Sequence, residues 1–154
     1  MTTAIDIIEE ATATVSEKLG YKVNFYAGTT QSVINYVERL KSNMDIYPAV
    51  VVFRDGMIEE TTIYGVKFTI PKIAICCYTD LNLTEKERRA VKYDTIIYPV
   101  FEELEKQLKL LDYSTVIQRI DIPFVNENRS NTFYDLVDGC IIKNLKMNVE
   151  VLTC

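Results

Sequence analysis

The sequence predicts one α+β domain over residues 1–154, with a mainly antiparallel sheet and two to three helices packed on it. Three observations lead to this fold class. Short apolar runs bounded by Pro, Gly and Asp, which are typical of strands, stand near the middle of the chain, and stretches with apolar residues at helical spacing lie on both sides of them. No internal repeat, low-complexity tract or long linker divides the chain. A length of 154 residues, 48% of them apolar, suits one ordinary domain with a sizeable core.

The first third of the chain predicts a helix, a strand and a second helix. Residues 3–19 carry apolar side chains along one helical stripe, and Gly20 follows as a C-cap. Residues 21–26 alternate polar and apolar side chains, as a short strand does. Residues 30–43 return to helical spacing after a threonine cap. The two buried stripes contain Ile5, Ile8, Thr12, Val15 and Leu19, and Val33, Ile34, Val37 and Leu40.

The middle of the chain predicts three strands, over residues 47–54, 59–69 and 71–79. The first contains the run Ala-Val-Val-Val-Phe, and so short an apolar run predicts a strand buried on both faces. Residues 59–69 alternate in the manner of a strand with one wetter face. Because Asp55-Gly56 is a turn dipeptide, we expect these strands to form an antiparallel meander.

A long amphipathic helix is predicted over residues 84–111. Thr84 and Glu87 form a capping box at its start, in which each side chain accepts a hydrogen bond from the other residue's backbone N–H. Pro99 lies inside the helical pattern, and we expect it to kink the helix or to mark a helix start near Thr95. The apolar positions of this helix are Ile96, Ile97, Val100, Phe101, Leu104, Leu108 and Leu111.

The last part of the chain predicts two strands separated by a loop. Residues 116–122 alternate and predict a strand, and residues 123–132 form a polar stretch without periodicity, which indicates a surface loop. Residues 138–152 alternate apolar side chains with Asn, Lys and Glu, so a closing strand with one buried face is expected there.

Charge and composition restrict the partners of the protein. The net charge is −5 and the Lys and Arg residues are mixed among acidic ones, which argues against sequence-specific nucleic-acid binding. No apolar run approaches the roughly 18 residues of a membrane span, and the N-terminus has no signal-peptide pattern. We therefore expect a protein that stays in the compartment where it is made, with no membrane partner and with its four Cys residues reduced.

Candidate chemistry is limited because the chain has no His, the most common general base near neutral pH and the most common metal ligand. Cys76 and Cys77 have two interpretations, a redox or metal pair and core filling. Core filling is favoured, because neighbours on a strand point to opposite faces of the sheet. Cys140 and Cys154 lie too far from other candidates in the sequence to build a site. We predict no catalytic, cofactor-binding or metal-ligating residue.

Three further patterns have a plain interpretation beside a functional one. The segment Gly-Thr-Thr-Gln-Ser at residues 28–32 precedes a helix and offers N–H groups to an anion, but it lacks the phosphate-loop spacing, so an ordinary helix cap is favoured. The carboxylates around the long helix, which might pair for acid–base work, are expected to be solvated with help from neighbouring basic residues. Ten Tyr residues suit protein interfaces or the core boundary. The carboxylates are Asp80, Glu85, Glu87, Asp94, Glu102 and Glu103, and the basic residues are Lys86, Arg88 and Arg89.

Four segments carry a resemblance to a known class of proteins. They are Tyr-Pro-Ala-Val-Val-Val-Phe at residues 47–53, Ile-Pro-Lys-Ile-Ala-Ile-Cys-Cys-Tyr-Thr-Asp at 70–80, the stretch from Glu87 to Ile-Ile-Tyr-Pro-Val-Phe-Glu-Glu-Leu at 96–104, and Phe-Tyr-Asp-Leu-Val-Asp-Gly-Cys-Ile-Ile-Lys-Asn-Leu at 133–145. Together they resemble small virion proteins of tailed bacteriophages that infect gut Bacteroidetes, of the tail-completion, tail-terminator or neck-ring (head–tail connector) class. Members often read Thr-Leu-Thr before the long helix, where this chain has Cys77-Tyr78-Thr79.

The resemblance implies a non-enzymatic structural protein of the virion neck or tail, located in the host cytoplasm before assembly. Copies would close into a homo-oligomeric ring, a hexamer or dodecamer, that joins or seals the head–tail connector. Genomic DNA would pass through the lumen without sequence-specific binding, and other neck, portal or tail proteins would be neighbours. The alternative is a small intracellular enzyme or ligand-binding module that uses Cys77 and Asp80 beside the helix start at Thr84.

Overall fold

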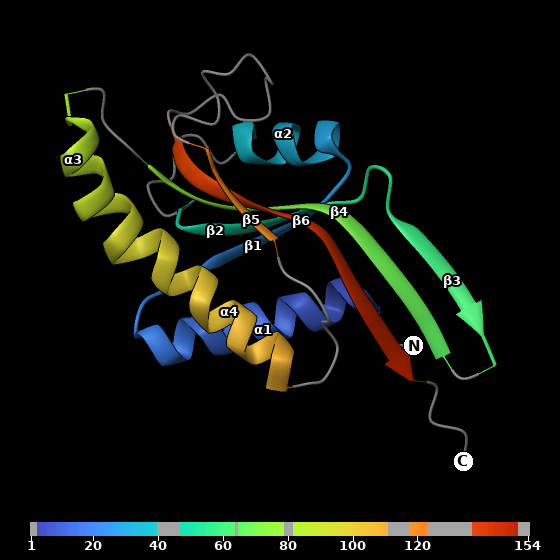
Figure 1. The fold of residues 1–154 in the computed structure, drawn as a ribbon. Helices are drawn as coiled ribbons and strands as arrows, with labels where there is room; N and C mark the ends of the chain where they lie inside the picture. The colour runs from blue at the N-terminus through green and yellow to red at the C-terminus, as the bar shows by residue number, and fades with distance from the viewer. Residues whose placement is uncertain are drawn as a thin grey trace.

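The computed structural model describes residues 3–39, 47–63, 65–78, 82–110, 118–122 and 137–150 (Figure 1). Six strands form one sheet in the order β1-β2-β4-β6-β5, with β3 also paired to β4. The strands are β1 (Asn24–Gly28), β2 (Ala49–Phe53), β3 (Ile58–Thr62), β4 (Gly65–Tyr78), β5 (Gln118–Ile122) and β6 (Val137–Glu150). The β1–β2 pair is parallel and the other pairs are antiparallel. The predicted α+β class with a mainly antiparallel sheet is confirmed.

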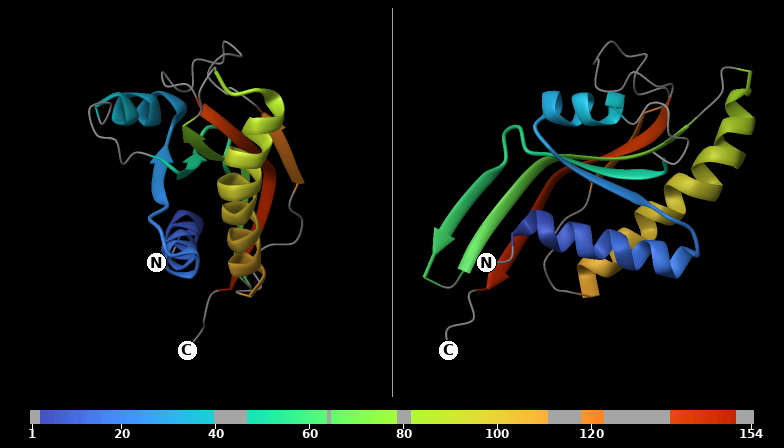
Figure 2. Two further views of the ribbon diagram at one scale, coloured as in Figure 1. Left: turned by 90° about the vertical axis from the view of Figure 1, so that its left-hand side faces the viewer. Right: turned by 180° about the vertical axis from the view of Figure 1, so that it is seen from behind.

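Helices lie on both faces of the sheet (Figures 1 and 2). Helix α1 (Ala4–Leu19) and helix α4 (Tyr98–Leu110) cover one face, and helix α2 (Thr30–Arg39) covers the other. Strand β2 supplies side chains to both layers and is buried throughout, as its sequence predicts. Its Val50 and Val52 belong to the core on the α1 and α4 side, and Ala49, Val51 and Phe53 to the core on the α2 side.

The predicted first helix is confirmed and the strand after it is shifted. Thr3 and Asp6 form a capping box at the start of α1, and Gly20 ends the helix with a left-handed φ of 79°. The strand was expected over residues 21–26, but β1 begins only at Asn24. The reason is that the N–H of Val23 donates to Oγ of Ser16 (2.9 Å), which ties the preceding segment to α1.

The first two described strands after α2 do not form the expected meander. Strands β2 and β3 both pair with β4, at Phe53↔Lys72 and Ile58↔Thr69, so they lie end to end along the same edge. Between them the N–H of Met57 donates to the carbonyl of Arg54 (3.0 Å), and Gly56 has a φ of 74°. The Asp-Gly dipeptide therefore makes a turn that returns the chain to the same neighbour, where a hairpin was expected.

The strands expected over residues 59–69 and 71–79 are wrong in their bounds. β3 ends at Thr62 and pairs with β4 from Gly65 onward, so a tight hairpin interrupts the first of them. β4 then continues to Tyr78 as one strand through Pro71. Pro71 lies between the part of β4 that pairs with β2 and the part that pairs with β3. Because neither strand pairs with residue 71, the missing N–H of proline removes no hydrogen bond to β2 or β3.

A matched irregularity crosses β4 and β6 at this point. Asn144 of β6 stands opposite Pro71, between the pairs Ile70↔Leu145 and Lys72↔Lys143. It has a positive φ of 52°. Ile70 and Ile73 both point into the core on the α1 and α4 side, and so do Ile142 and Leu145. Both strands therefore reverse their inward and outward alternation at the same level, and their register is maintained.

The predicted long helix is continuous from Glu85 to Leu110. It comprises α3 (Glu85–Arg88), a π-helical segment η2 (Arg89–Ile97) and α4. The capping box of Thr84 and Glu87 is confirmed. The expected helix start near Thr95 is wrong, because the chain passes through it as a π-helix, in which the N–H of Tyr98 donates to the carbonyl of Tyr93. This wide segment ends shortly before Pro99, so the helix accommodates the proline by a change of pitch.

Several predicted bounds fall partly outside the described residues. These are residues 40–43 of the second helix, residue 64 of the strand expected over 59–69, residue 79 of the strand expected over 71–79, residue 111 of the third helix, residues 116–117 before β5, the loop over 123–132, and residues 151–152 after β6. Within the described parts, β5 and β6 agree with the predicted strands to within one residue at Val137.

Candidate functional site

The most distinctive surface is a three-stranded arm that projects from the body of the molecule (Figures 1 and 2). We define the arm as β3 with residues 65–70 of β4 and 145–150 of β6, which pair side by side. One face of the arm is buried in the core on the α1 and α4 side through Val66, Phe68, Ile70, Leu145 and Met147. All five residues of β3 are exposed. The arm is thus anchored on one face and open along β3.

The open face of the arm and its continuation toward α2 carry basic side chains. Lys67 and Lys146 are exposed on β4 and β6. Further along, Lys72 stands directly opposite Lys143, and its ammonium lies 4.8 Å from the ring centre of Phe53. Burial, with the repulsion from Lys143 added to it, lowers the pKa of Lys72. The nearby Asp55 carboxylate acts on this pKa in the opposite direction, so the lysines of this surface have acidic neighbours.

Strand β3 is acidic and apolar by contrast. Glu59 and Glu60 are exposed, and Glu60 stands opposite Lys67 of β4. Ile58 and Ile63 leave 54% and 84% of their surface exposed, the latter in the turn that follows β3. Apolar side chains this exposed on a strand at a sheet edge are typical of a surface that another chain covers.

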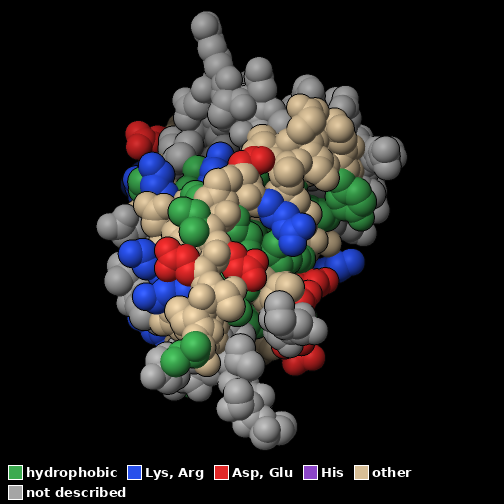
Figure 3. All heavy atoms as spheres, turned by 90° about the vertical axis from the view of Figure 1, so that its right-hand side faces the viewer, with side chains coloured by type: hydrophobic (Ala, Val, Ile, Leu, Met, Phe, Trp, Pro, Cys, Tyr) green, Lys and Arg blue, Asp and Glu red, His purple; other side chains and the backbone are tan. Residues whose placement is uncertain are grey.

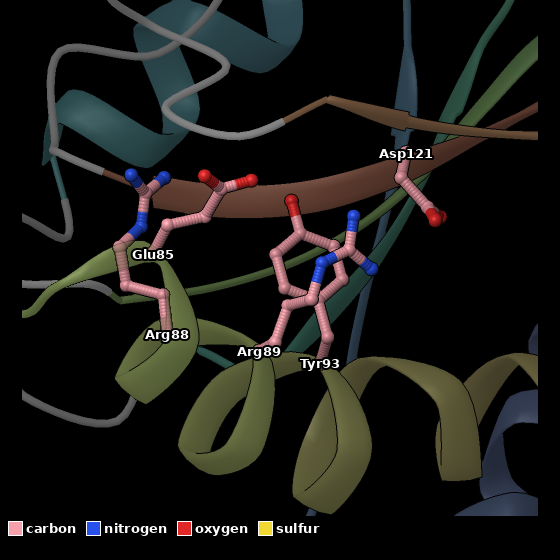
Figure 4. Close-up of a pocket in the computed structure, with 5 residues that line it drawn as sticks. All are labelled: Glu85, Arg88, Arg89, Tyr93 and Asp121. Atoms are coloured by element: carbon pink, nitrogen blue, oxygen red, sulfur yellow. The ribbon is translucent and has the colours of Figure 1, made fainter.

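A second candidate lies where the start of the long helix meets β5 and β6. A pocket of about 190 Å³ is lined by Glu85, Arg88, Arg89, Tyr93 and Asp121 (Figure 4). Arg88 makes a bidentate ion pair with Asp138 of β6, with Nε 3.0 Å from Oδ2. The Asp138 side chain is fully buried and the Arg88 side chain is 11% exposed. The pair joins α3 to the sheet and closes one wall of the pocket.

Three further polar residues of the pocket form hydrogen bonds with groups around it. The hydroxyl of Tyr93 donates to the carbonyl of Gly139 (3.1 Å), and the hydroxyl of Tyr98 donates to Asp121 (2.7 Å). Arg89 donates to the Tyr98 oxygen (3.3 Å). Burial raises the pKa of Tyr93 above its ordinary value, so its hydroxyl stays protonated near neutral pH. These hydrogen bonds join the π-helical segment to β6 and the start of α4 to β5.

The cysteines lie as the sequence predicts, on opposite faces. Cys77 belongs to the core on the α1 and α4 side and Cys76 to the core on the α2 side, and both are buried. Burial raises the pKa of Cys77 from 9.0 to about 12, and that of Cys140 likewise to about 12. A protonated, buried thiol is a poor nucleophile, so the geometry gives no support to the alternative function at Cys77. Asp80 and Cys154 lie outside the described residues.

The Gly-Thr-Thr-Gln-Ser segment is a helix cap. The hydroxyl of Thr29 accepts from the N–H of Ser32 (3.2 Å), which confirms the favoured interpretation. The carboxylate of Asp55 accepts from the N–H of Thr30 (2.7 Å) and from its hydroxyl. The N-terminus of α2 thus already holds an anionic group from the chain itself, which the sequence did not reveal.

The carboxylates of the long helix follow the prediction in part. Glu87 serves in the capping box, and Asp94 and Glu102 are exposed. The expectation that Arg88 helps to solvate them is wrong, because Arg88 is taken up by Asp138 fifty residues further along the chain. No local signal in the sequence identifies this pair, because Asp135 and Asp138 both precede the apolar run of the last strand.

The described Tyr residues divide between the core and its boundary. Two are buried, three are partly buried and two are exposed. The buried ones are Tyr47 and Tyr93, the partly buried ones are Tyr26, Tyr78 and Tyr98, and the exposed ones are Tyr21 and Tyr36. Exposed Tyr36 stacks at 5.5 Å on Tyr26, beside a shallow hollow between β1 and α2. The core-boundary interpretation accounts for most of those that the structure describes.

Comparisons with protein families and with characterised proteins find no match to this chain. Among the described residues, no group of three or more Cys, Asp or Glu side chains is placed to hold a metal ion. No helix in the described parts of the chain has the length and apolar character to cross a membrane.

Proposed function

We propose that the protein is a structural virion component that forms a homo-oligomeric ring in the neck or tail of a tailed bacteriophage. The ring joins or seals the head–tail connector around the channel through which DNA leaves the capsid. Support comes from the sequence resemblance over roughly residues 47–151 and from the surface that the fold offers to a neighbouring copy.

The observation that carries the proposal is the projecting arm with its exposed strand. A ring requires a heterologous interface, in which two different patches of each subunit meet on its two sides. Sheet edges are ready-made partners for another chain, and β3 leaves both its backbone edge and its apolar side chains exposed. A buried inner face holds the arm to the core, so the arm presents its edge without first having to fold.

The test is the protein content of purified particles. Quantitative mass spectrometry of virions produced with this gene is expected to find the chain at about six or twelve copies per particle, the ring sizes that the resemblance implies, since a ring closes by rotation. The phage major capsid protein is the internal standard and an abundant host cytoplasmic protein the contamination control. Particles that contain the chain at no more than the level of the host protein contradict the proposal.

A further inference from the structure

The arm has two open edges at the same level of the sheet. β3 pairs with residues 65–69 of β4. On the other side of β4, β6 pairs with this same stretch from Lys146 to Glu150. β5 pairs with β6 only between Gly139 and Lys143, so among the described strands the β6 part of the arm has β4 on one side alone. In the part of the chain that the structure describes, each side of the arm therefore ends in an open strand edge.

The two open edges run in the same direction. β3 and β6 are both antiparallel to β4. A rotation about an axis roughly along the arm keeps strand directions unchanged, and it brings β3 of one copy alongside β6 of the next as a parallel pair. Each copy then offers one edge and receives the other, which is the condition for a ring that closes by rotation.

Charge distinguishes this pairing from its alternatives. Looking onto the β3 side of the molecule, Figure 3 shows acidic side chains on both sides of an exposed stretch of backbone, with Lys and Arg side chains close to them. On the open face of the arm, Glu60 is exposed on β3 and Lys146 is exposed on the part of β6 that does not pair with β5, and Glu150 ends that strand. Joining β3 to β3 brings the acidic residues of the two copies together, whereas β3 against β6 places Glu60 near Lys146, a pair of opposite charge.

We propose that the open edge of β3 in one copy pairs in parallel with the open edge of β6 in the next, so that the arms form a continuous intermolecular sheet. Glu60 already faces its own Lys67 across the open face, and in the assembly Lys146 of the neighbouring copy flanks it from the other side. In the proposed ring, this contact would be the interface between neighbouring copies. Its biological role therefore rests on the proposed function, whereas the pairing itself depends only on the two strand edges and their charges.

Disulfide trapping between two separately purified variants tests the contact. Glu60→Cys and Lys146→Cys, each in a Cys154→Ser background, are mixed and oxidised. Neighbouring strands place Cα atoms within the roughly 4.4–6.8 Å that a disulfide spans, so a mixed dimer is expected. Glu10→Cys, at an exposed position of α1 away from the arm, replaces Glu60→Cys in the control mixture. The arm pair is expected to give at least about tenfold more dimer than this control. The reason is that the contact raises the effective concentration of one thiol at the other, whereas the control thiols meet only by random collision.

Charge exchange gives an independent measurement. Glu60→Lys alone and Lys146→Glu alone are each expected to weaken self-association by about tenfold, because an attractive cross-strand pair becomes a repulsive one. The chain with both changes is expected to recover association, and the sedimentation coefficient at several salt concentrations reports it. Both positions are exposed, so far-ultraviolet circular dichroism is expected to stay unchanged and to exclude misfolding.

The outcomes separate this contact from the proposed function. Equal dimer yields in the arm and control mixtures, or a double variant no better than the two single ones, overturn the arm contact even where virions contain a ring. Trapped arm dimers from a chain that is absent from virions support the contact and contradict the function.

Discussion

At the scale of single residues, the Arg88–Asp138 pair holds the start of the long helix to the sheet. Asp138 is fully buried, and its charge has a bidentate guanidinium partner. Removing one member of a buried pair leaves the other charge without compensation, which costs far more than the pair itself contributes.

We therefore expect Arg88→Ala to lower the free energy of unfolding by about 3–5 kcal/mol. Replacing both partners, with Arg88→Met and Asp138→Leu, is expected to recover most of that loss because no buried charge remains. Urea unfolding followed by circular dichroism measures both. Lys86→Ala, two residues before Arg88 in α3 and exposed, is the control and is expected to change stability by less than about 0.5 kcal/mol. A loss below about 1 kcal/mol for Arg88→Ala contradicts this role.

The buried thiols predict how stability depends on pH. Cys77 and Cys140 have a pKa raised from 9.0 to about 12 in the folded protein. Above pH 9 the unfolded chain gains thiolate that the folded chain does not form. The stability contributed by these thiols is therefore complete below pH 9 and is lost as the pH rises from 9 toward 12.

The Cys77→Ala variant isolates this effect. In reducing buffer, the decline of the unfolding free energy with pH is expected to be shallower in the variant by up to about 1.4 kcal/mol per pH unit. Urea unfolding at a series of alkaline pH values measures the slope. Identical slopes for the variant and the natural chain contradict the buried, protonated thiol.

At the scale of elements, the paired irregularity at Pro71 and Asn144 lets two long strands serve two layers. In residues 65–70 of β4 and 145–150 of β6, the inward side chains anchor the arm to the core. In residues 72–78 and 137–143, the same strands pack between α2 and the other helices. Asn144 takes a φ of 52°, a left-handed conformation that Asn and Gly tolerate and β-branched residues do not.

Asn144→Val is accordingly expected to destabilise the fold by about 1–2 kcal/mol, and Asn144→Gly to change it little. Asn148→Val, exposed on the same strand, controls for the loss of an amide, since valine suits an ordinary strand position. Thermal unfolding compares the three variants. Equal melting temperatures for the two valine variants argue against a strained position at Asn144.

Local signals in the sequence located most elements, and pairing between distant segments was not accessible to them. The Thr84 capping box, the Gly20 C-cap and the buried β2 run depend on neighbouring residues, and each is confirmed. The turn before Gly65 was missed because alternation continues on both sides of it, so one strand and a tight hairpin give the same pattern.

The candidate site was harder still to predict from sequence. The arm depends on β3 pairing with β4 and leaving its other edge open, and a register is a property of two segments together. The contact of Arg88 with Asp138 spans 50 residues, and that of Asp55 with the start of α2 spans 25, so neither has a local signature. Burial of both cysteines, by contrast, followed from their place in an apolar strand.

At the scale of the whole molecule, the fold combines a core covered by helices on both faces with an arm open along its sides. The body carries the buried Arg88–Asp138 pair and the buried thiols, and the arm carries exposed Glu60 on β3 and exposed Lys146 on β6. This division predicts that changes in the arm alter assembly with little effect on folding, whereas changes in the body alter folding first.

Image reconstruction of the intact particle tests the central proposal most directly. We expect a symmetric ring of this chain at the neck or tail, coaxial with the DNA channel, into which the sheet and its two helical layers fit. Complete, infectious particles whose neck and tail density is fully accounted for by other proteins contradict it.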